Sequence, residues 1–289
     1  MRRSAPVDGF SLAYDRSGSG TSVVLLHGWP GDRDDWREVA RRLGEHGGLD
    51  IVAPDLRGFG DSDRHPADPS QAYAAAPQAR SVLGLIAELG LERPVLAGYD
   101  VGSRVAQAAA IADPPAVRAL VLAPPLPGVG RRVLEPDAQS EFWYQSFHRL
   151  PLAEELIDGR PEAVHTYLWH FWEHWSGPGY VPEPARLERL TAAYARPGAF
   201  TASIAWYRAG AGTVARSLAE RAPDPADRIA VPTTVLWPEH DPLFPPAWGD
   251  RLDEFFSAAQ VRPLPDSGHF SPLEAPAAFA EAIVAAAGA

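Results

Sequence analysis

The sequence predicts an α/β protein with a mostly parallel central sheet flanked by helices. Five short runs rich in β-branched residues and leucine alternate with helical patterns along the chain. Such alternation is typical of βαβ units, whose parallel strands are buried on both faces. The 289-residue chain is 46% hydrophobic, which suffices for a buried core. We therefore expect a folded globular chain.

The expected elements follow one another in a simple order. Strands are expected at residues 22–26, 51–54, 94–97, 119–122 and 233–237. Helices are expected at residues 35–43, 72–89, 103–112 and 248–256, with an amphipathic closing helix at 275–287. The closing segment contains Glu281 and is too short to span a bilayer.

The alternation stops between residues 128 and 216, where helical segments rich in aromatic residues and histidine take over. Five of the nine tryptophans lie there: Trp143, Trp169, Trp172, Trp175 and Trp206. Residues 169, 172 and 175 lie about one helical turn apart, a spacing typical of a core-facing stripe, and we expect other tryptophans to line a pocket. The sequence thus predicts a helical cap domain (128–216) inserted into a core domain (1–127 and 217–289).

Charge and composition exclude several classes of partner and site. The formal net charge is −11 and no basic run occurs, which argues against nucleic acid or an anionic membrane as a partner. The absence of cysteine excludes disulfides and thiolate metal sites. Because no apolar h-region follows Met1, we expect a cytoplasmic protein. The sequence is compatible with a homodimer but does not specify the oligomeric state.

The most informative stretch is Gly98-Tyr99-Asp100-Val101-Gly102, which joins an expected strand to an expected helix. This pattern is typical of a nucleophile elbow, with aspartate where esterases carry serine. A carboxylate that displaces a leaving group at a saturated carbon forms an ester, which water can then hydrolyse. Asp100 as the nucleophile therefore predicts an epoxide or an alkyl halide as the electrophile.

Two later segments supply partners for Asp100. Asp241 follows the strand at 233–237, and His269 lies in a turn near the carboxyl end. The chain order nucleophile, acid, histidine predicts that Asp241 orients His269, which activates water. Glu239 is the alternative acid, but Asp241 lies farther past the strand and is preferred.

The segment His27-Gly28-Trp29-Pro30 follows the first expected strand as a tight turn. We expect the backbone N–H groups of Trp29 and Val101 to form an oxyanion hole for attack on the Asp100 ester. His27 is expected to be structural, because His269 already provides the base.

Taken together, these motifs resemble those of α/β-hydrolase-fold epoxide hydrolases, which are related to haloalkane and fluoroacetate dehalogenases. The resemblance spans nearly the whole chain and rests on residues 27–30, 55–62, 98–102, 239–241 and 268–269. It also includes Phe142-Trp143-Tyr144-Gln145 and Trp206-Tyr207-Arg208. In that family paired phenols protonate the oxirane oxygen, so the resemblance assigns this role to Tyr144 and Tyr207. The expected substrate-binding residues are Trp143, Trp206, Phe270 and Arg104.

Departures from the family patterns leave two alternatives. Val101 stands where haloalkane dehalogenases and many epoxide hydrolases carry tryptophan. Fluoroacetate dehalogenases place arginines around the elbow to hold the substrate carboxylate; Arg104 matches one of them, but Val101 replaces another. A haloacid dehalogenase is therefore the first alternative. The second is a non-catalytic binding protein of the same fold, although the nucleophile, acid, histidine and tyrosine pair are all present.

No cofactor and no metal ion are expected. The chain has neither a Walker loop nor a Rossmann glycine fingerprint. His170 and His174 flank Glu173 but have no third ligand nominated by the sequence. The predicted function is an epoxide hydrolase that acts without a cofactor on a small-molecule epoxide, with the aromatic cap suggesting a bulky or aromatic one.

Overall fold

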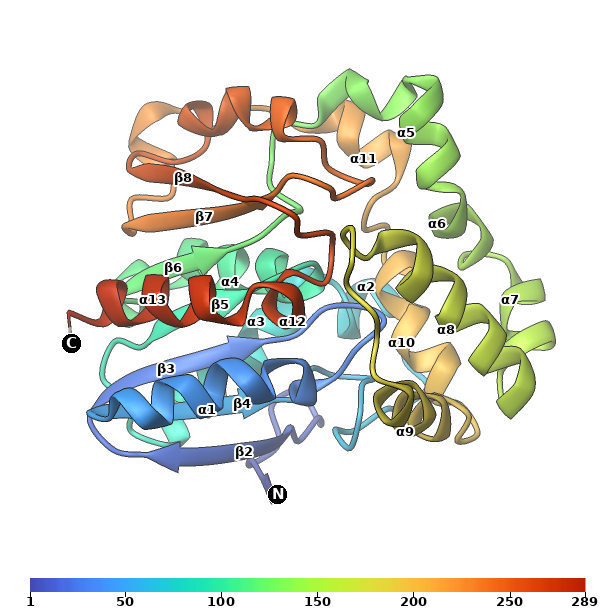
Figure 1. Cartoon of the computed structure of the whole chain (residues 1–289), viewed down its shortest axis with the longest axis horizontal. Helices are drawn as coiled ribbons and strands as arrows, with labels where there is room; N and C mark the ends of the chain where they lie inside the picture. The colour runs from blue at the N-terminus through green and yellow to red at the C-terminus, as the bar shows by residue number, and fades with distance from the viewer. Residues whose placement is uncertain (289) are drawn as a thin grey trace.

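The computed structural model describes residues 1–288, and a single eight-stranded sheet forms its centre (Figure 1). The strands are β1 Arg2–Arg3, β2 Ala13–Gly18, β3 Thr21–Leu26, β4 Leu49–Pro54, β5 Val95–Gly98, β6 Ala119–Leu122, β7 Thr233–Pro238 and β8 Ala259–Leu264. Their order is β1-β2-β4-β3-β5-β6-β7-β8. Strands β3 to β8 pair in parallel, whereas β1 and β2 pair antiparallel. The predicted α/β class is confirmed.

All five expected strands are present, each within two residues of its predicted bounds. Strands β4, β5 and β6 are buried at every position because helices cover both faces of the sheet. Strands β1, β2 and β8 are not among the expected strands, and all three lie on or next to an edge of the sheet. Strand β8 is exposed at four consecutive positions, so it lacks the apolar run by which a buried strand is recognised.

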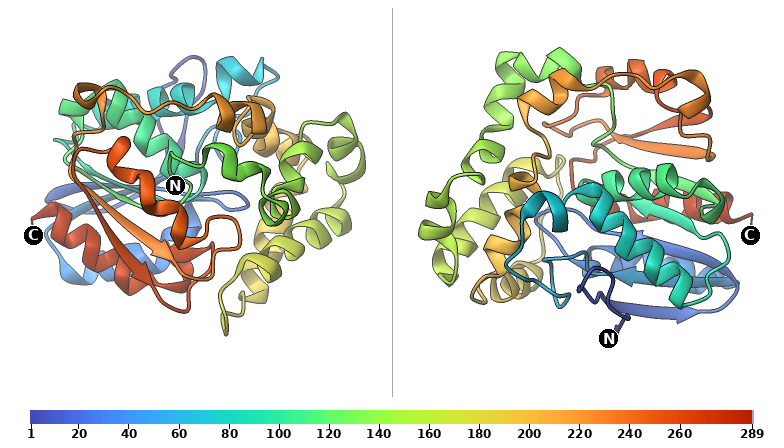
Figure 2. Two further views of the ribbon diagram at one scale, coloured as in Figure 1. Left: turned by 90° about the horizontal axis from the view of Figure 1, so that it is seen from above. Right: turned by 180° about the vertical axis from the view of Figure 1, so that it is seen from behind.

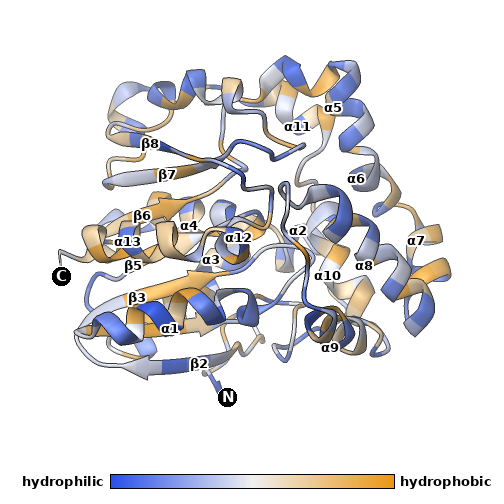
Figure 3. Ribbon diagram, in the orientation of Figure 1, coloured by the Kyte–Doolittle hydropathy of each residue, from blue (hydrophilic) through white to orange (hydrophobic). Residues whose placement is uncertain are grey.

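Four long helices sandwich the sheet. The helices α1 Arg37–His46 and α13 Pro276–Ala287 pack together on one face, and α3 Ala75–Glu88 and α4 Val101–Ala112 pack together on the other (Figure 2). Figure 3 shows the central strands as largely hydrophobic and the outward side of α1 as hydrophilic. This distribution is expected of amphipathic helices that cover a buried sheet.

The expected helix at 72–89 consists of two helices, α2 Pro69–Ala72 and α3. Pro77 has no N–H to donate to the Tyr73 carbonyl, and its ring would clash with that group in a continuous helix. The helix therefore restarts at Ala75. Two other expected helices contain 3₁₀ turns: η1 Arg33–Trp36 precedes α1, and η5 Pro246–Glu254 replaces the helix at 248–256.

A set of helices that we name the helical layer follows β6 and lies beside the sheet at the end to which β3 points (Figure 1). It comprises η3 Gly130–Leu134, α5 Pro136–Glu141, α6 Trp143–Phe147, α7 Pro151–Ile157, α8 Pro161–Trp175, α9 Pro184–Tyr194, α10 Ala199–Arg208 and α11 Val214–Ala219. Helix α11 continues past the predicted domain boundary at residue 216. Within the described residues 1–288, no helix combines the length and apolarity that crossing a membrane requires.

The remaining short elements are η2 Pro114–Ala116, η4 Pro225–Asp227 and α12 Ser271–Glu274. Helix α12 matters for the site, because it directly follows His269 and Phe270. The carboxyl ends of the parallel strands β3, β5 and β7 lead into the segments that hold Trp29, Asp100 and Asp241. In open α/β sheets this edge is where ligands bind.

Candidate active site

Asp100 occupies a sharp turn between β5 and α4, with a backbone φ of 47°. Positive φ is strained for a residue with a side chain. Two glycines make the turn feasible, since a Cβ on Gly98 would collide with the backbone of Gly102, and one on Gly102 would collide with the backbone of Leu26. The turn is closed by the Asp100 N–H, which donates to the Pro124 carbonyl at 3.0 Å. The Asp100 side chain is thus presented at the edge of the sheet.

The turn after β3 approaches Asp100 closely. The Trp29 backbone N–H donates to Asp100 Oδ2 at 2.9 Å. A Cβ on Gly28 would lie 2.7 Å from the Asp100 Cβ and 2.8 Å from the Tyr99 ring, so only glycine allows this approach. Val101 is the first residue of α4, where the helix itself supplies no acceptor for the backbone N–H. One backbone donor, the Trp29 N–H, therefore contacts an Asp100 oxygen, and the Val101 N–H has no acceptor within its own helix.

His269 lies between two carboxylates. Its Nδ1 is 3.0 Å from Asp241 Oδ2, and its Nε2 is 3.6 Å from Asp100 Oδ2. The other Asp241 oxygen accepts from the Leu243 N–H at 2.9 Å, which fixes that carboxylate. Burial alone would lower the pKa of His269, but the charges and hydrogen bonds of Asp241 and Asp100 outweigh burial and raise it to about 10. The imidazole is therefore protonated at neutral pH.

Glu239 and His27, the other ionisable residues considered from the sequence, have different surroundings. Glu239 is exposed, and its backbone N–H pairs with Leu264. His27 is fully buried, with Nδ1 2.9 Å from the Gly28 carbonyl and Nε2 accepting from the Leu56 N–H at 3.0 Å. Since one ring nitrogen donates and the other accepts, the neutral His27 ring is fully satisfied where it lies.

Tyr144 and Tyr207 come from α6 and α10 of the helical layer and meet above Trp29. Their ring centroids are 5.5 Å apart at 85°, and the Trp29 ring stacks on Tyr144 at 5.8 Å. Both tyrosines are buried. Burial, followed by the charge of Asp100, raises the pKa of Tyr144 well above its ordinary value. Burial also raises the pKa of Tyr207. Both phenols therefore keep their protons at neutral pH.

Asp100 and the two phenols line the same cavity, which has a volume of about 720 Å³. Its lining includes Asp100, Tyr144, Tyr207, Arg104 and Trp206, so five predicted site residues face one space. Apolar residues complete much of the wall: Leu126, Val129, Val133, Phe142, Ile229, Phe244 and Phe255. The volume accommodates a small organic molecule, and the mixed wall is typical of small-molecule sites.

Trp143 and Phe270, the other two residues expected to bind substrate, are not among the residues that line this cavity. Adjacent positions on a helix point in different directions. Tyr144 of α6 therefore faces inward, whereas its neighbour Trp143 is 43% exposed. Phe270 stacks on Trp172 with ring centroids 3.7 Å apart and is fully buried. Phe270 is therefore part of the buried core beside His269.

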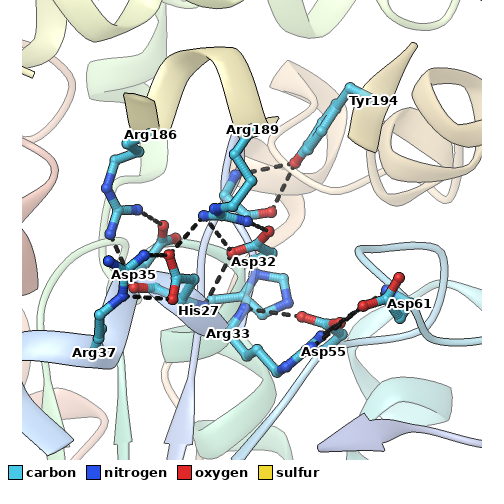
Figure 4. Close-up of polar contacts among 12 residues, drawn as sticks. His27, Asp32, Arg33, Asp35, Arg37, Asp55, Asp61, Arg186, Arg189 and Tyr194 are labelled. Atoms are coloured by element: carbon cyan, nitrogen blue, oxygen red, sulfur yellow. Dashed lines mark hydrogen bonds and ion pairs between the residues drawn. The ribbon is translucent and has the colours of Figure 1, made fainter. Parts of the chain in front are cut away.

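An ionic network beneath the Trp29 turn joins the core to α9 (Figure 4). Arg186 Nη1 of α9 donates to Asp35 Oδ1 at 2.6 Å, and the Tyr99 hydroxyl donates to Asp35 Oδ2 at 2.6 Å. Burial raises the pKa of Asp35 to about 6. Tyr194, also on α9, accepts from the Gly31 N–H at 3.0 Å and donates to the Gly31 carbonyl at 2.9 Å. Helix α9 thus binds Gly31 directly through Tyr194 and reaches Tyr99 through the Arg186–Asp35 ion pair.

Glu274, which sequence reasoning missed, joins the His269 loop to the helical layer. Its Oε2 accepts from the Gly268 N–H at 2.7 Å and from the Gly177 N–H at 2.8 Å. The His269 N–H donates to the Trp175 carbonyl at the end of α8, at 2.8 Å. Glu274 carries no sequence signal for this role, because its partners are backbone groups brought together only by the fold.

The described part of the chain contains no cluster of side chains that could hold a metal ion. Among residues 1–288, three or more histidine, aspartate or glutamate side chains nowhere converge in a way that could hold a metal ion. The His170 and His174 rings are stacked with centroids 5.9 Å apart, and His174 Nε2 contacts Glu141 at 2.8 Å.

Residues 21–276 match the model of the alpha/beta hydrolase fold family. The chain belongs to this family. The match spans the five expected strands and every side chain placed around Asp100 above.

Three similar proteins are informative. A soluble epoxide hydrolase of Corynebacterium sp. (strain C12) is 29% identical over 283 residues, covering 94% of this chain and 92% of the relative. A fluoroacetate dehalogenase of Burkholderia sp. is 29% identical over 217 residues, covering 74% and 70%. A crystal structure of an epoxide hydrolase from Bacillus megaterium covers 100% of both chains with a TM-score of 0.81 at 20% identity, which shows the shared fold alone. The relatives support a hydrolase of this fold.

Proposed function

We propose that the protein is an epoxide hydrolase that adds water to an oxirane to give a vicinal diol through a covalent ester on Asp100. One observation carries this proposal: a carboxylate at the nucleophile elbow faces a histidine on one side and shares a cavity with two protonated phenols. The similarity to an epoxide hydrolase over 94% of the chain supports it. No cofactor takes part.

In the first step, an Asp100 oxygen attacks a ring carbon and the ring C–O bond breaks. The departing alkoxide takes a proton from Tyr144 or Tyr207, which is needed because an unassisted alkoxide is a poor leaving group near neutral pH. The products are a hydroxyalkyl ester of Asp100 and a phenolate. The raised pKa of both phenols keeps this proton available until the ring opens.

In the second step, water attacks the ester carbonyl and gives a proton to His269. The backbone N–H groups of Trp29 and Val101 hold the oxyanion that forms on Asp100. As the ester C–O bond breaks, His269 passes the proton to the leaving oxygen and the diol departs. The regenerated Asp100 carboxyl group gives its proton to the phenolate. His269, which released its own proton to solvent after ester formation, takes one back from solvent, so the enzyme returns to its starting state.

The charge of Asp100 couples the two steps. In the resting enzyme, Asp241 and Asp100 together hold the pKa of His269 at about 10. Ester formation removes the negative charge of Asp100, so the pKa of His269 falls while Asp241 still orients the ring. His269 becomes a competent base only after the nucleophile has reacted.

We also propose that residues 128–216 form a cap domain over a core of residues 1–127 and 217–289, since the helical layer supplies both phenols and much of the cavity wall. Cytoplasmic location, a homodimer and an aromatic substrate stay predictions.

A haloacid dehalogenase is the second candidate, favoured by Arg104 in the cavity wall and by the similarity to a fluoroacetate dehalogenase. In that reaction Asp100 would displace halide from the carbon beside a carboxylate, with Arg104 holding the carboxylate. Val101 offers no second charge next to Asp100.

The test uses His269→Ala with a panel of aryl epoxides, fluoroacetate and chloroacetate, followed by intact-protein mass and peptide mapping. The expected result is a mass gain equal to one whole epoxide, located on Asp100, because the ester forms but is not hydrolysed. The Asp100→Ala/His269→Ala double variant is the control and should remain unmodified. A gain equal to the haloacid minus hydrogen halide would replace the proposal with a dehalogenase. Normal multiple turnover by His269→Ala would contradict the mechanism.

A further inference from the structure

The cavity continues from Asp100 along one face of α4. Arg104, Gln107, Ala108 and Ile111 all line it, and their spacing of three to four residues places them on one side of the helix. From Asp100 to Ile111 the helix rises by about 16 Å. Ile111 is 62% exposed, so the cavity opens to solvent at that end. An oxirane bound at Asp100 occupies only the inner end of this space.

Arg104 stands between the inner end and the opening, and its guanidinium is held in place. Gln107 is 96% buried and donates from Nε2 to the Pro125 carbonyl at 3.1 Å and to Ser103 Oγ at 3.2 Å. Its carbonyl oxygen accepts from Arg104 Nη1 at 3.2 Å. A buried, fully anchored amide therefore orients the Arg104 side chain toward the cavity.

The charge of Arg104 is only weakly compensated. Its nearest carboxylate, Glu220 Oε1, is 3.8 Å from Nη2, beyond hydrogen-bond distance. The other oxygen of Glu220 is already used, since it accepts from the Gly128 N–H at 2.7 Å. Burial lowers the pKa of Arg104 in spite of Glu220. Several N–H donors of the guanidinium thus remain for an acceptor in the cavity.

Arg216 on α11 lines the same cavity near its opening. Within residues 1–288 its guanidinium makes no hydrogen bond or ion pair, although its backbone N–H donates to Thr213. Its charge contributes to lowering the pKa of Arg104, which places the two arginines within electrostatic reach of each other. The cavity wall also holds Arg221 and the carboxylates Glu220 and Asp227. Apart from Asp100, its three arginines outnumber its two carboxylates, so in a chain with a net charge of −11 this wall favours an anion.

We propose that the substrates are elongated epoxides that carry a carboxylate, with the oxirane between Asp100 and the two phenols and the carboxylate at Arg104 and Arg216. The proposal rests on the epoxide hydrolase function above. The chain between the two groups lies against the apolar wall formed by residues such as Leu126 and Phe142. The anionic group is thus separated from the reacting carbon by a spacer, unlike the carboxylate of a haloacetate.

The test compares a series of ω-epoxy carboxylates of increasing chain length with their methyl esters, using the full-length enzyme. The readout is the ratio of kcat/KM for each acid to kcat/KM for its ester. We expect the ratio to peak at an intermediate chain length. Arg104→Gln should lower the peak ratio at least about tenfold, because charge-assisted hydrogen bonds are lost. Arg216→Gln should lower it about threefold, since this residue is exposed.

Glu220→Gln should change the ratio in the opposite direction, raising it a few-fold, because a carboxylate that repels the substrate is removed. Arg132→Gln is the matched control: Arg132 is partly exposed and paired with Asp250 outside the cavity wall, and its ratio should equal that of the unmodified enzyme. Equal losses for acids and esters in Arg104→Gln, or no dependence on chain length, would overturn the inference. If the unmodified enzyme hydrolyses neither acids nor esters, the epoxide hydrolase function itself fails.

Discussion

The two sides of the candidate site are held in place by different means. On the sheet side, Asp100 is fixed by backbone sterics: its positive φ, the glycines around it and the N–H of Trp29 leave one arrangement. On the helical-layer side, Tyr144 and Tyr207 are fixed by aromatic packing on Trp29 and on each other. The sheet side is thus specified locally, whereas the layer side depends on how whole helices dock.

Contacts that cross between the sides make this docking specific. Arg186 and Tyr194 of α9 bind Asp35 and Gly31, and Glu274 joins the end of α8 to the His269 loop. In the proposed mechanism the chemistry divides along the same line, with the nucleophile and base on the sheet side and the acids on the layer side. Variants of the layer-side phenols should therefore slow ring opening alone, whereas a variant of the sheet-side His269 should slow ester hydrolysis.

The largest effect is expected on the sheet side. Asp100→Ala should lower kcat for epoxide hydrolysis by about four orders of magnitude or more, because no covalent route remains. Steady-state diol formation measures this loss. Glu239→Gln is the matched control, since this carboxylate is exposed, and it should retain full activity. A strong loss in Glu239→Gln with a mild one in Asp241→Asn would show that the acid was assigned to the wrong residue.

On the layer side, the Tyr144→Phe/Tyr207→Phe variant should slow ring opening by about 10²- to 10⁴-fold, because general acid assistance is lost. Single-turnover kinetics should show slower ester formation with little change in ester hydrolysis. Tyr167→Phe provides a control, since this hydroxyl contacts His148 at 2.9 Å and does not line the cavity. Equal slowing of both steps in the double variant would place the phenols outside ring opening.

The charge coupling between Asp100 and His269, both on the sheet side, predicts a pH effect on the second step. His269 must lose its proton to act as base, and Asp100 contributes, after Asp241, to raising its pKa to about 10. In the ester the pKa should be lower, so hydrolysis should rise about tenfold per pH unit and level off below pH 10. Rapid-quench measurement of ester decay checks this. A hydrolysis rate still rising at pH 10 would mean that ester formation does not lower the pKa.

The same pKa shift predicts an effect on folding stability. The pKa of His269 is raised from an ordinary value of 6.5 to about 10 in the folded state. The resulting stabilisation is complete below pH 6.5 and is lost as the pH rises toward 10. The difference in unfolding free energy between the unmodified enzyme and His269→Gln should therefore shrink between pH 6.5 and 10 in urea titrations.

The smallest effect on activity is expected from the contact between the sides at Gly31. Tyr194→Phe removes the hydroxyl that satisfies both backbone groups of Gly31 in a buried site, which should destabilise the protein by about 1–3 kcal/mol. We expect kcat to fall only a few-fold. Tyr180→Phe, at a partly exposed position, is the control and should change stability by less than about 0.5 kcal/mol. Equal unfolding free energies for the two variants would show that the Tyr194 hydroxyl does not stabilise the docking of α9.

The sequence by itself determined the features that are local in the chain. The buried strands and the glycine-bounded turn at Asp100 leave a sequence signature because strand burial and turn sterics act over a few neighbouring residues. The chain order of Asp100, Asp241 and His269 is also visible in the sequence, because Asp100 and Asp241 follow expected strands and His269 lies in a turn near the carboxyl end. The structure places His269 3.0 Å from Asp241 and 3.6 Å from Asp100.

Only the tertiary structure decided which aromatic residues face the cavity. Trp143 and Tyr144 are neighbours in the same motif, yet one is 43% exposed and the other lines the cavity. The roles of Gln107 and Glu274 also had no sequence signal. Their partners are backbone groups and side chains that only the folded chain brings within reach. The direction in which a side chain of the helical layer points, and the groups that it contacts, depend on how the helices dock. Docking is a property of the whole fold.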